Sequence, residues 1–163
     1  MTKIGLISDT HGFLDDAVFK HFDQCDEIWH AGDFGPDVVD KLKAFKPLRG
    51  VYGNIDGYDI RSEYPETLRW KTEDVEVLMT HIGGYPGRYA PAVRAALINN
   101  PAQLFISGHS HILKVIYDDK MKCLHMNPGA AGKHGWHKVR TLIRFVIDGK
   151  AMKQCEVVEL GKR

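Results

Sequence analysis

Short apolar runs alternate with helix-like apolar repeats over the first two thirds of the chain. The runs are bounded by glycine, proline or aspartate, which predicts buried strands. Between the runs, apolar side chains recur three and four residues apart, which predicts helices. The predicted strands are residues 3–8, 27–30, 48–52, 75–80 and 104–106. The predicted helices have apolar faces over residues 14–22, 38–45 and 92–97, and Pro36 suits the first position of the second helix.

The last third of the chain changes to a hairpin pattern. Residues 112–117 and 121–126 flank a polar turn, and residues 139–147 alternate between apolar and polar side chains. Asp148-Gly149 is a strong turn signal before a final strand that runs to Leu160. Alternating strands and helices followed by hairpins predict an α/β protein, with helices outside two sheets or one curved sheet. No linker, charge run or repeat divides the chain, so residues 1–163 are predicted to form a single domain.

Composition excludes several classes of protein. The chain has 22 lysines and arginines against 21 aspartates and glutamates. The resulting net charge of +1 lacks a basic excess, so we expect no stable binding of nucleic acid. Cys25, Cys123 and Cys155 are too widely spaced for a thiolate zinc module, and their odd number argues against a disulfide framework. No segment approaches the ~20 apolar residues of a membrane span or has the pattern of a signal peptide, so we expect a cytoplasmic protein without membrane association.

Metal-capable side chains follow each of the five predicted strands. In chain order they are Asp9 and His11, then Asp33, Asn54 and His81, and finally His109 and His111. Ligands bind beyond the carboxyl ends of the strands in open α/β sheets, so these seven side chains are predicted to meet. Nitrogen and oxygen donors without thiolates favour Mn²⁺, Fe²⁺, Ni²⁺ or Zn²⁺ over Ca²⁺ and Mg²⁺. Seven donors exceed the needs of one ion, which predicts two divalent ions bridged by a shared carboxylate.

These motifs have the order found in the calcineurin-like metallophosphoesterases. The residues that resemble the superfamily signature are Asp9-x-His11, Gly32-Asp33, Gly53-Asn54, His81 and Gly108-His109-Ser110-His111. With Asn127-Pro128-Gly129, the chain is most similar to the small phosphodiesterase branch related to Vps29. The resemblance implies a four-layer fold of two mixed sheets flanked by helices, with the metal site at the C-terminal strand ends. It also implies one ion at Asp9, His11, Asp33 and His111 and another at Asp33, Asn54, His81 and His109, with Asp33 as the bridge.

The implied activity is that of a phosphoesterase in which a metal-bridging hydroxide attacks the phosphorus in line. Mn²⁺ is the expected metal, with Ni²⁺, Fe²⁺ or Zn²⁺ as alternatives. One position departs from the family pattern, because many phosphomonoesterases of this superfamily have a histidine general acid directly after the asparagine, where this chain has Ile55. Loss of a general acid typically costs ~10²–10⁴ in rate. We therefore expect a small phosphodiester as substrate, and we interpret Asp56 as an acceptor for loop amides.

Simpler explanations fit each of these residues alone, but not all of them together. Asp9 and Asp33 could cap helices, and Asn54 could form a turn. For these explanations to hold together, metal-capable residues would have to follow five successive strands by coincidence, which is a poor explanation. The main alternative to an enzyme is a non-catalytic scaffold or protein-interaction module of the same fold, as Vps29 is. A scaffold is free to lose ligands, whereas all seven positions here are metal-capable. The sequence also leaves a homo-oligomer open.

Other residues carry weaker signals. His30 is interpreted as a core residue or as support behind the ligands. His134 and His137 lie in a glycine-rich loop that could overhang the metals or be solvated. Arg88 could pair with a phosphate oxygen or lie on the surface at the start of a helix. The two histidines interpreted as surface or half-buried residues are His21 and His125.

Overall fold

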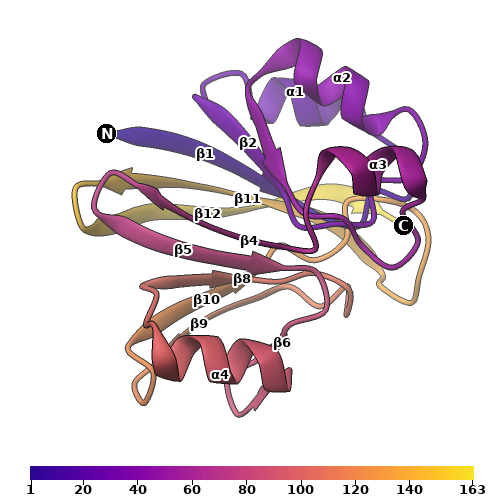
Figure 1. The fold of residues 1–163 in the computed structure, drawn as a ribbon. Coiled ribbons are helices and arrows are strands. Elements are labelled where there is room, and N and C mark those ends of the chain that lie inside the picture. The colour runs from indigo at the N-terminus through magenta and orange to yellow at the C-terminus, as the bar shows by residue number, and fades with distance from the viewer.

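The computed structural model of residues 1–163 has four layers, with two sheets packed face to face and helices outside them (Figure 1). The first sheet has the order β12-β11-β1-β2-β3, formed by β1 (Thr2–Ile7), β2 (Glu27–His30), β3 (Leu48–Gly50), β11 (Val139–Asp148) and β12 (Ala151–Lys162). The second has the order β4-β5-β8-β10-β9, formed by β4 (Thr67–Thr72), β5 (Val75–Thr80), β8 (Leu104–Ile106), β9 (Lys114–Asp118) and β10 (Cys123–Asn127). A separate ribbon pairs β6 (Gly84–Tyr85) with β7 (Arg88–Tyr89).

The helices lie on both sides of the paired sheets. On the side of the first sheet are α1 (Ala17–His21), α2 (Val38–Phe45) and α3 (Tyr58–Glu63), and α4 (Pro91–Asn99) lies on the side of the second (Figure 1). Both sheets are mixed, because β1–β2–β3 and β5–β8–β10 are parallel whereas the outer pairings are antiparallel. The predicted α/β fold of two mixed sheets flanked by helices is confirmed. None of the helices is long and apolar enough to cross a membrane.

Strand β1 contributes to two core layers because its side chains alternate between opposite faces. Ile4 and Leu6 are fully buried between the sheets, whereas Ile7 joins a second cluster under α1 and α2. Gly5 allows the ring of Phe22 to lie against the strand, since a Cβ at Gly5 would stand 2.6 Å from that ring. The core between the sheets also contains Trp29, Val77, Leu104, Ile106, Ile143 and Phe145.

The second predicted helix begins later than its sequence pattern indicates. Pro36 is not its first residue, because Asp37 adopts a left-handed conformation (φ 67°) and the helix starts at Val38. A residue in that conformation cannot continue a right-handed helix. Pro36 instead packs against the preceding loop, where its Cδ lies 3.0 Å from the position of a Cβ at Gly12.

Helix α3 and strand β4 are absent from the predictions made above. None of the residues of α3 is buried, so the helix presents no apolar stripe to detect. In β4, Leu68 and Trp70 alternate with Arg69 and Lys71, which is a strand signal that the sequence carries. The strand pairs with β5 through a turn in which Glu73 is left-handed (φ 50°).

The directions of the strands place five loops at one side of the molecule. Strands β1, β2 and β3 are parallel and therefore end at the same edge of the first sheet. Strands β5 and β8 are also parallel, and they end at an edge of the second sheet on the same side of the molecule (Figure 1). The loops that follow these strands carry the seven candidate ligands.

Candidate metal centre

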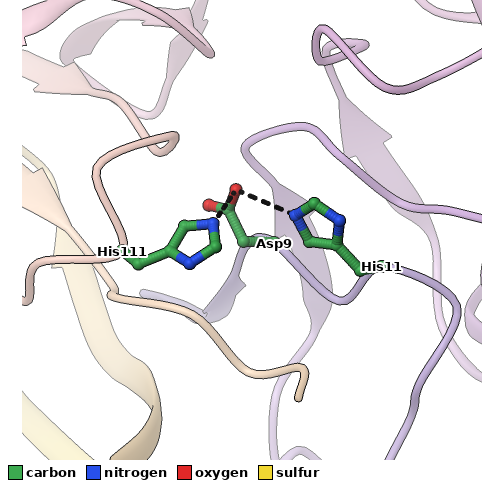
Figure 2. Close-up of side chains that lie close together, drawn as sticks. All are labelled: Asp9, His11 and His111. Atoms are coloured by element: carbon green, nitrogen blue, oxygen red, sulfur yellow. Dashed lines mark ion pairs between the residues drawn. The ribbon is translucent and has the colours of Figure 1, made fainter. Parts of the chain in front are cut away.

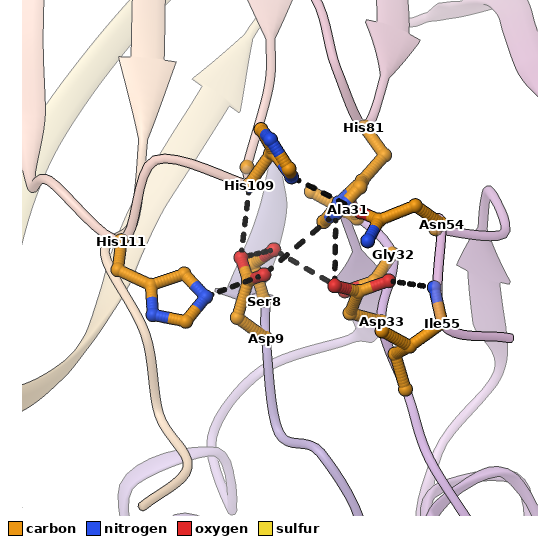
Figure 3. Close-up of polar contacts among 12 residues, drawn as sticks. Ser8, Asp9, Ala31, Gly32, Asp33, Asn54, Ile55, His81, His109 and His111 are labelled. Carbon is orange, nitrogen blue, oxygen red and sulfur yellow. Dashed lines mark hydrogen bonds and ion pairs between the residues drawn. The ribbon is translucent and has the colours of Figure 1, made fainter. Parts of the chain in front are cut away.

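The structure brings together all seven side chains that the sequence singles out. They come from the loops after β1, β2, β3, β5 and β8 and converge between the two sheet edges, as Figure 2 shows for His11 and Figure 3 shows for the other six. Asp9, Asp33 and His81 are buried, and the others lie nearer the surface. The complete set is Asp9, His11, Asp33, Asn54, His81, His109 and His111.

Six of these side chains form two groups of three whose ligand atoms lie within 4.8 Å of one another. The first cluster is Asp9, His11 and His111, and the second cluster is Asp33, His81 and His109. In the first cluster, Asp9 Oδ1 lies 3.1 Å from His111 Nε2 and 3.8 Å from His11 Nε2 (Figure 2).

The two clusters adjoin through Asp33. Its Oδ2 lies 3.4 Å from Nε2 of His11, in the first cluster, and 3.2 Å from Nε2 of His81, in the second. Asn54 belongs with the second cluster, because its Oδ1 lies 3.1 Å from His81 Nε2 and 3.0 Å from His109 Nδ1 (Figure 3). The Asp33 carboxylate is therefore in reach of donors on both sides.

Two buried atoms of the first cluster have no hydrogen-bond partner, namely Asp9 Oδ1 and His11 Nε2. Buried polar atoms are normally paired, because an unpaired one costs about 1–3 kcal/mol. A carboxylate oxygen and an imidazole nitrogen that face one another without a proton donor fit a divalent cation between them. The donor set thus fits metal ions.

Backbone geometry helps to aim these side chains. Five of the seven residues adopt a left-handed conformation: Asp9 (φ 53°), His11 (φ 46°), Asp33 (φ 59°), His109 (φ 66°) and His111 (φ 60°). Such conformations cost of order 1–3 kcal/mol each and cluster at functional sites. The loops are held by backbone hydrogen bonds, since the N–H of Asp9 donates to Gly32 O and that of His11 donates to Asp33 O, both at 3.0 Å. The strained loops are thereby tied to one another.

Glycine at position 53 is required by close approach. A Cβ there would collide with the Asp33 carboxylate and lie 2.4 Å from the Asp33 backbone nitrogen. The absence of a side chain lets the loop after β3 pass directly beside the loop after β2. The N–H of Ile55 can then donate to Asp33 Oδ1 at 3.0 Å, which leaves Oδ2 to face the imidazoles.

Hydrogen bonds to the outer ring nitrogens orient two of the imidazoles. His81 Nδ1 donates to the carbonyl oxygen of Ala31 at 2.7 Å, so its Nε2 faces Asp33. His111 Nδ1 lies 3.3 Å from His137 Nδ1, and His137 Nε2 lies 2.7 Å from the carbonyl oxygen of Gly132. A carbonyl only accepts, so His137 must donate through Nε2 and accept through Nδ1. His111 therefore donates through Nδ1, and its Nε2 faces Asp9 Oδ1.

His30 supports the centre from behind. Its ring is fully buried and stacks on Phe34 at 3.7 Å between ring centres. The Gly32 N–H donates to Nδ1 at 3.1 Å, so Nε2 carries the proton and donates to Thr10 Oγ1 at 3.0 Å. Thr10 in turn donates to Phe34 O at 2.7 Å. This chain joins the loop of Asp9 and His11 to the loop of Asp33, which confirms the interpretation of His30 as core support.

The carboxylates of the centre are held in their charged form. Burial acts to raise the pKa of Asp9, but the imidazoles of His11 and His111 beside it outweigh that effect and hold the pKa well below its usual range. The pKa of Asp33 is also lowered, because the pairing with His81 outweighs burial. For His81, burial acts to lower the pKa, but the pairing with Asp33 raises it overall. Binding of a cation by His81 requires its neutral form and therefore competes with its protonation.

The pKa of His109 shifts in the opposite direction from that of His81. Burial and the neighbouring imidazole of His81 together lower the pKa of His109. A lowered pKa favours the neutral imidazole, which is the form that binds metals.

Asp56 has the role predicted for it. Its carboxylate accepts hydrogen bonds from the backbone N–H groups of Gly53 (2.8 Å), Gly35 (3.1 Å) and Phe34 (3.2 Å). It therefore joins the loops after β2 and β3. The side chain of Ile55 is 46% exposed and offers no group that could transfer a proton.

Other candidates occupy different positions from those expected. His125 is 1% exposed, so its interpretation as a surface or half-buried residue is wrong. It lies on β10, an interior strand, where it stacks on Phe105 and Nδ1 donates to the Phe105 carbonyl oxygen at 3.2 Å. Arg88 lies in β7 and not at a helix start, since α4 begins at Pro91. His21, half-buried in the last turn of α1, has the position expected.

The glycine-rich loop reaches the first cluster. The His134 ring lies 4.7 Å from that of His11, and the side chain of His134 is otherwise exposed. His137 is fully engaged between His111 and Gly132. Arg61 was not singled out from the sequence, yet it donates to the carbonyl oxygens of Asp56 and Asn54 at 2.6 and 3.3 Å and so holds the loop of Asn54.

Two cavities flank the second cluster. The first, of about 230 Å³, is lined by residues that include Ile82, Tyr85, His109, Lys114 and His125. The second, of about 200 Å³, is lined by residues that include Tyr52, Asn54, Arg61, His81 and Ile82. The first cavity contains one lysine, the second contains one arginine and one glutamate (Glu66), and Ile82 borders both. The arrangement leaves room for an organic group on either side of His81 and His109.

Comparisons with known proteins agree with these motifs. A family model of the calcineurin-like phosphoesterase superfamily domain matches residues 2–150. A protein of Methanothermobacter thermautotrophicus named probable metallophosphoesterase is 35% identical over 115 residues. That match covers 66% of this chain and 66% of the relative, slightly under two thirds of its length.

Several solved structures share the fold. Vps29 of Chaetomium thermophilum has a TM-score of 0.77 at 16% identity, with 100% of both chains covered. A structure described as a novel archaeal phosphodiesterase has a TM-score of 0.76 at 23% identity, covering 97% of this chain and 99% of that one. Entamoeba histolytica Vps29 complexed with zinc has a TM-score of 0.73 at 17% identity, covering 96% and 98%. At these identities the likeness concerns the fold alone.

The relay through His137 generates a prediction about metal binding. In a His137→Ala variant, His111 loses the acceptor that fixes its Nε2 lone pair, so one of two bound ions should bind ~10–100-fold more weakly. His137→Gln is the matched control, because its amide can accept from His111 and donate to Gly132. Calorimetric titration of chelator-treated protein with Mn²⁺ measures both affinities. Two unchanged affinities in the alanine variant would show that the relay does not orient His111.

The buried His30 generates a prediction about pH. Burial lowers its pKa to about 3, against an ordinary value of 6.5, so folding favours the neutral ring. The contribution of the neutral His30 ring to the free energy of unfolding is complete above pH ~6.5. It is lost as the pH falls towards ~3, by about 1.4 kcal/mol per pH unit. Urea unfolding of the metal-free protein between these pH values should show a shallower dependence for His30→Gln than for wild type. His21→Gln, in α1, should keep the wild-type slope; equal slopes in all three proteins would contradict the assignment.

Proposed function

Because this chain belongs to the calcineurin-like phosphoesterase superfamily, we propose that it hydrolyses small phosphodiesters with the help of two divalent metal ions. Family membership supports the coarser statement that the protein hydrolyses phosphoesters with bound metal. The observation that carries the finer proposal is the pair of adjoining donor clusters, flanked by two cavities and lacking a histidine at position 55.

The proposed ligands divide between the two clusters. Asp9, His11, Asp33 and His111 would hold one ion, and Asp33, Asn54, His81 and His109 would hold the other. The position of Asp33 Oδ2 between His11 and His81 supports a bridging role for that carboxylate. When bound, two such ions would neutralise the phosphoryl charge and activate a water as nucleophile near neutral pH.

The chain's own residues prepare the centre before any ion binds. Ser8 donates to Asp9 Oδ2 at 2.6 Å, and the His109 N–H donates to the same oxygen at 3.1 Å. Oδ1 of Asp9 is thereby left to face the cluster. Asp33 is held in the same way. The backbone N–H of Ile55 donates to Asp33 Oδ1, which leaves Oδ2 free to face the cluster. Such preorganisation lowers the free energy needed to assemble the site around a metal.

The two cavities favour a diester over a monoester. A phosphodiester has two organic groups and a monoester has one, and the cavities lie on either side of His81 and His109. Lys114 adds positive charge for an anionic substrate in the first cavity, whereas the second cavity contains both Arg61 and Glu66. Position 55 supports the same choice, because isoleucine cannot protonate a poor leaving group. A phosphodiesterase is among the structures with the same fold.

Mn²⁺ is the ion we propose for this donor set. The ligands are carboxylates, imidazoles and one amide, without thiolate, which suits Mn²⁺ and also Ni²⁺, Fe²⁺ and Zn²⁺. Mg²⁺ prefers oxygen ligands and keeps several waters, so an imidazole-rich centre is a poorer site for it.

A non-catalytic scaffold is the second candidate, favoured by the likeness to Vps29 structures. A scaffold needs the outer surface of the fold and not a metal centre. The unpaired Asp9 Oδ1 and His11 Nε2 argue against it, since a fold released from metal binding gains stability by replacing them. The two candidates differ in whether removal of metal changes activity.

The first functional prediction concerns metal removal. Protein treated with a chelator should lose the ability to hydrolyse bis(4-nitrophenyl) phosphate, and Mn²⁺ should restore it better than Mg²⁺. Asp33→Asn, which weakens the proposed bridge, should reduce the rate by at least about 10²-fold, the scale of a mechanistic contribution. Asp148→Asn, in an exposed turn of β11, is the matched control and should keep the wild-type rate.

Thermal stability gives an independent measurement of the same proposal. Metal that binds only the folded protein should stabilise it by ~2.7 kcal/mol at a hundredfold excess over its dissociation constant. Full activity in metal-free protein would overturn the metal mechanism. No melting shift together with no activity would support the scaffold instead.

The second functional prediction concerns the leaving group. With Ile55 in place of a general acid, the rate should depend steeply on leaving-group pKa, so that aryl diesters with acidic phenols react and alkyl esters barely do. Ile55→His should accelerate poor leaving groups most and leave activated aryl esters nearly unchanged. A series of aryl methyl phosphate diesters measures the slope.

His134 supplies the competing explanation, because its exposed ring lies against His11 and could itself donate a proton. In that case the wild-type slope would be shallow and His134→Gln would steepen it. His137 is a poorer donor, since both of its ring nitrogens are engaged. If the rate still depended only weakly on leaving-group pKa after loss of both His134 and His137, the residue at position 55 would have no role in the mechanism.

A further inference from the structure

Strand β9 is an outer strand with an exposed apolar surface. It is the last strand of the second sheet (Figure 1). Val115, Ile116 and Tyr117 are 41%, 45% and 52% exposed, and Ile112 and Leu113 just before the strand are 61% and 37% exposed. Native proteins usually protect such edges with charge, proline or a covering element, because unpaired strands recruit other strands. In β9 the charges of Lys114 and Asp118 are confined to the two ends, so the exposed apolar residues between them mark an interaction surface.

The free backbone groups of this edge can be assigned from the neighbouring strand. Leu124 and Met126 direct their backbone groups towards β8, because the Leu124 N–H donates to Gln103 O at 2.8 Å and Met126 O accepts from the Ser107 N–H at 3.1 Å. Alternate residues of β10 therefore face β9, and His125 is opposite Ile116 in that register. It follows that Val115 and Tyr117 direct their N–H and C=O groups to the open edge.

The side chains of β9 divide into two faces. Lys114, Ile116 and Asp118 share one face. The ammonium of Lys114 lies 4.0 Å from the Tyr85 ring centre, and Asp118 Oδ2 accepts from the Tyr89 hydroxyl at 2.6 Å. Both tyrosines belong to the β6–β7 ribbon, so the basic and acidic ends of the strand are on the same side of the sheet.

We propose that β9 pairs with β9 of a second copy of this chain, antiparallel about a two-fold axis at Ile116. In this register Lys114 of each copy lies opposite Asp118 of the other, and the Ile116 side chains meet at the axis. Val115 of one copy exchanges backbone hydrogen bonds with Tyr117 of the other. The Lys114–Asp118 pairs occupy positions without backbone hydrogen bonds, where opposite side chains approach most closely.

Charge selects this register over its neighbours. A two-fold axis at Tyr117 would place Lys114 opposite Lys120, which is a like-charge pair on each side of the axis. An axis at Val115 would place Lys114 opposite Ile116 and leave the ammonium without a partner. The axis at Ile116 alone gives opposite charges at both ends and apolar contacts between them.

Asp118 is able to accept the additional contact. Its Oδ1 accepts from the backbone N–H groups of Lys120 and Met121, at 2.9 and 3.2 Å, and its Oδ2 accepts from Tyr89. A carboxylate has about four acceptor positions, so one is left for the second copy's lysine. The Tyr89 hydroxyl also lowers the pKa of Asp118, which keeps it charged at neutral pH.

The pairing does not depend on the proposed activity. It uses a strand at the edge of the fold, whereas the metal centre lies beyond the ends of β1, β2, β3, β5 and β8. Lys114 is the one residue of the pairing that also lines the first cavity. A strand pair with its flanking residues buries less than the ~800 Å² per partner of a standard interface, so we expect a dissociation constant in the micromolar range.

Sedimentation velocity of the full chain tests the dimer. Between about 1 and 200 µM, a range that brackets micromolar affinity, the wild type should change from monomer to dimer. Ile116→Lys places two ammonium groups at the axis and should keep the protein monomeric throughout. Val157→Lys is the matched control, because Val157 is a β-branched residue, 42% exposed, on β12, the outer strand of the first sheet. This variant should dimerise as the wild type does.

A cross-link tests the register. Opposite residues without backbone hydrogen bonds have Cα atoms ~4.5 Å apart, within the range of a disulfide. In a Cys155→Ser background, which removes the exposed native thiol, Ile116→Cys should form a covalent dimer on mild oxidation. Tyr117→Cys, whose two copies lie diagonally across the axis, should not.

Several results would overturn the pairing. In sedimentation, these results are a wild type that stays monomeric, a dimer that persists in the Ile116→Lys variant, or an open series of larger species. In cross-linking, the contrary result is a Tyr117→Cys dimer that forms more readily than the Ile116→Cys dimer. A two-fold contact closes on itself and cannot extend. The melting temperature of Ile116→Lys checks that loss of the dimer is not loss of the fold.

Discussion

Buried donor atoms without partners govern the centre of this protein. Asp9 Oδ1 and His11 Nε2 are buried and have no hydrogen-bond partner, and His111 Nε2 lies 3.1 Å from the same Asp9 oxygen. Asp9 is fully buried, so water cannot pair with these atoms, and an unpaired buried polar group costs free energy. A divalent cation held by these residues would offset that cost. The arrangement of the donors thus makes the site a receptor for positive charge.

The surrounding loops are built to sustain this arrangement without the cation. Left-handed backbone at Asp9, His11 and Asp33 would relax in an isolated loop, because each such residue costs free energy. Asp56, by accepting three backbone N–H groups, and His30, through Thr10, join the loops to one another. The strain is therefore opposed by neutral hydrogen bonds and by stacking within the protein. The donor atoms are therefore held in position before any ion binds.

The convergence of the seven candidate ligands was predictable from the sequence, as were the supporting roles of His30 and Asp56, but the contact of His137 with His111 was not. Asp9, Asp33 and His81 follow apolar strands within three residues, and a metal-capable residue just after such a strand can be recognised without a structure. His137 is 26 residues from His111 and has no pattern that links the two. Its role depends on how the loop after β10 folds back, which local sequence does not specify.

The fold was predictable to a similar depth. Buried strands such as β1 and β5 carry continuous apolar runs, and these appeared at the expected places. Helix α3 was not predicted, because none of its residues is buried and the sequence therefore lacks an apolar repeat. The start of α2 was misplaced because a left-handed Asp37 overrides the preference of Pro36 for a first helical turn. Both errors arise where tertiary contacts, and not periodicity, decide the backbone.

The stability of the fold and the chemistry of the centre are largely separate. The three apolar clusters lie between the sheets, under α1 and α2, and under α4, and none of them includes any of the seven candidate ligands. Substitution of a ligand therefore removes no apolar packing, and replacing a buried, unpaired polar group can even stabilise a protein. A chain with this core can keep or lose the metal centre under separate selection. That separation accounts for how structures at 16–23% identity, described as Vps29 and as a phosphodiesterase, share one fold.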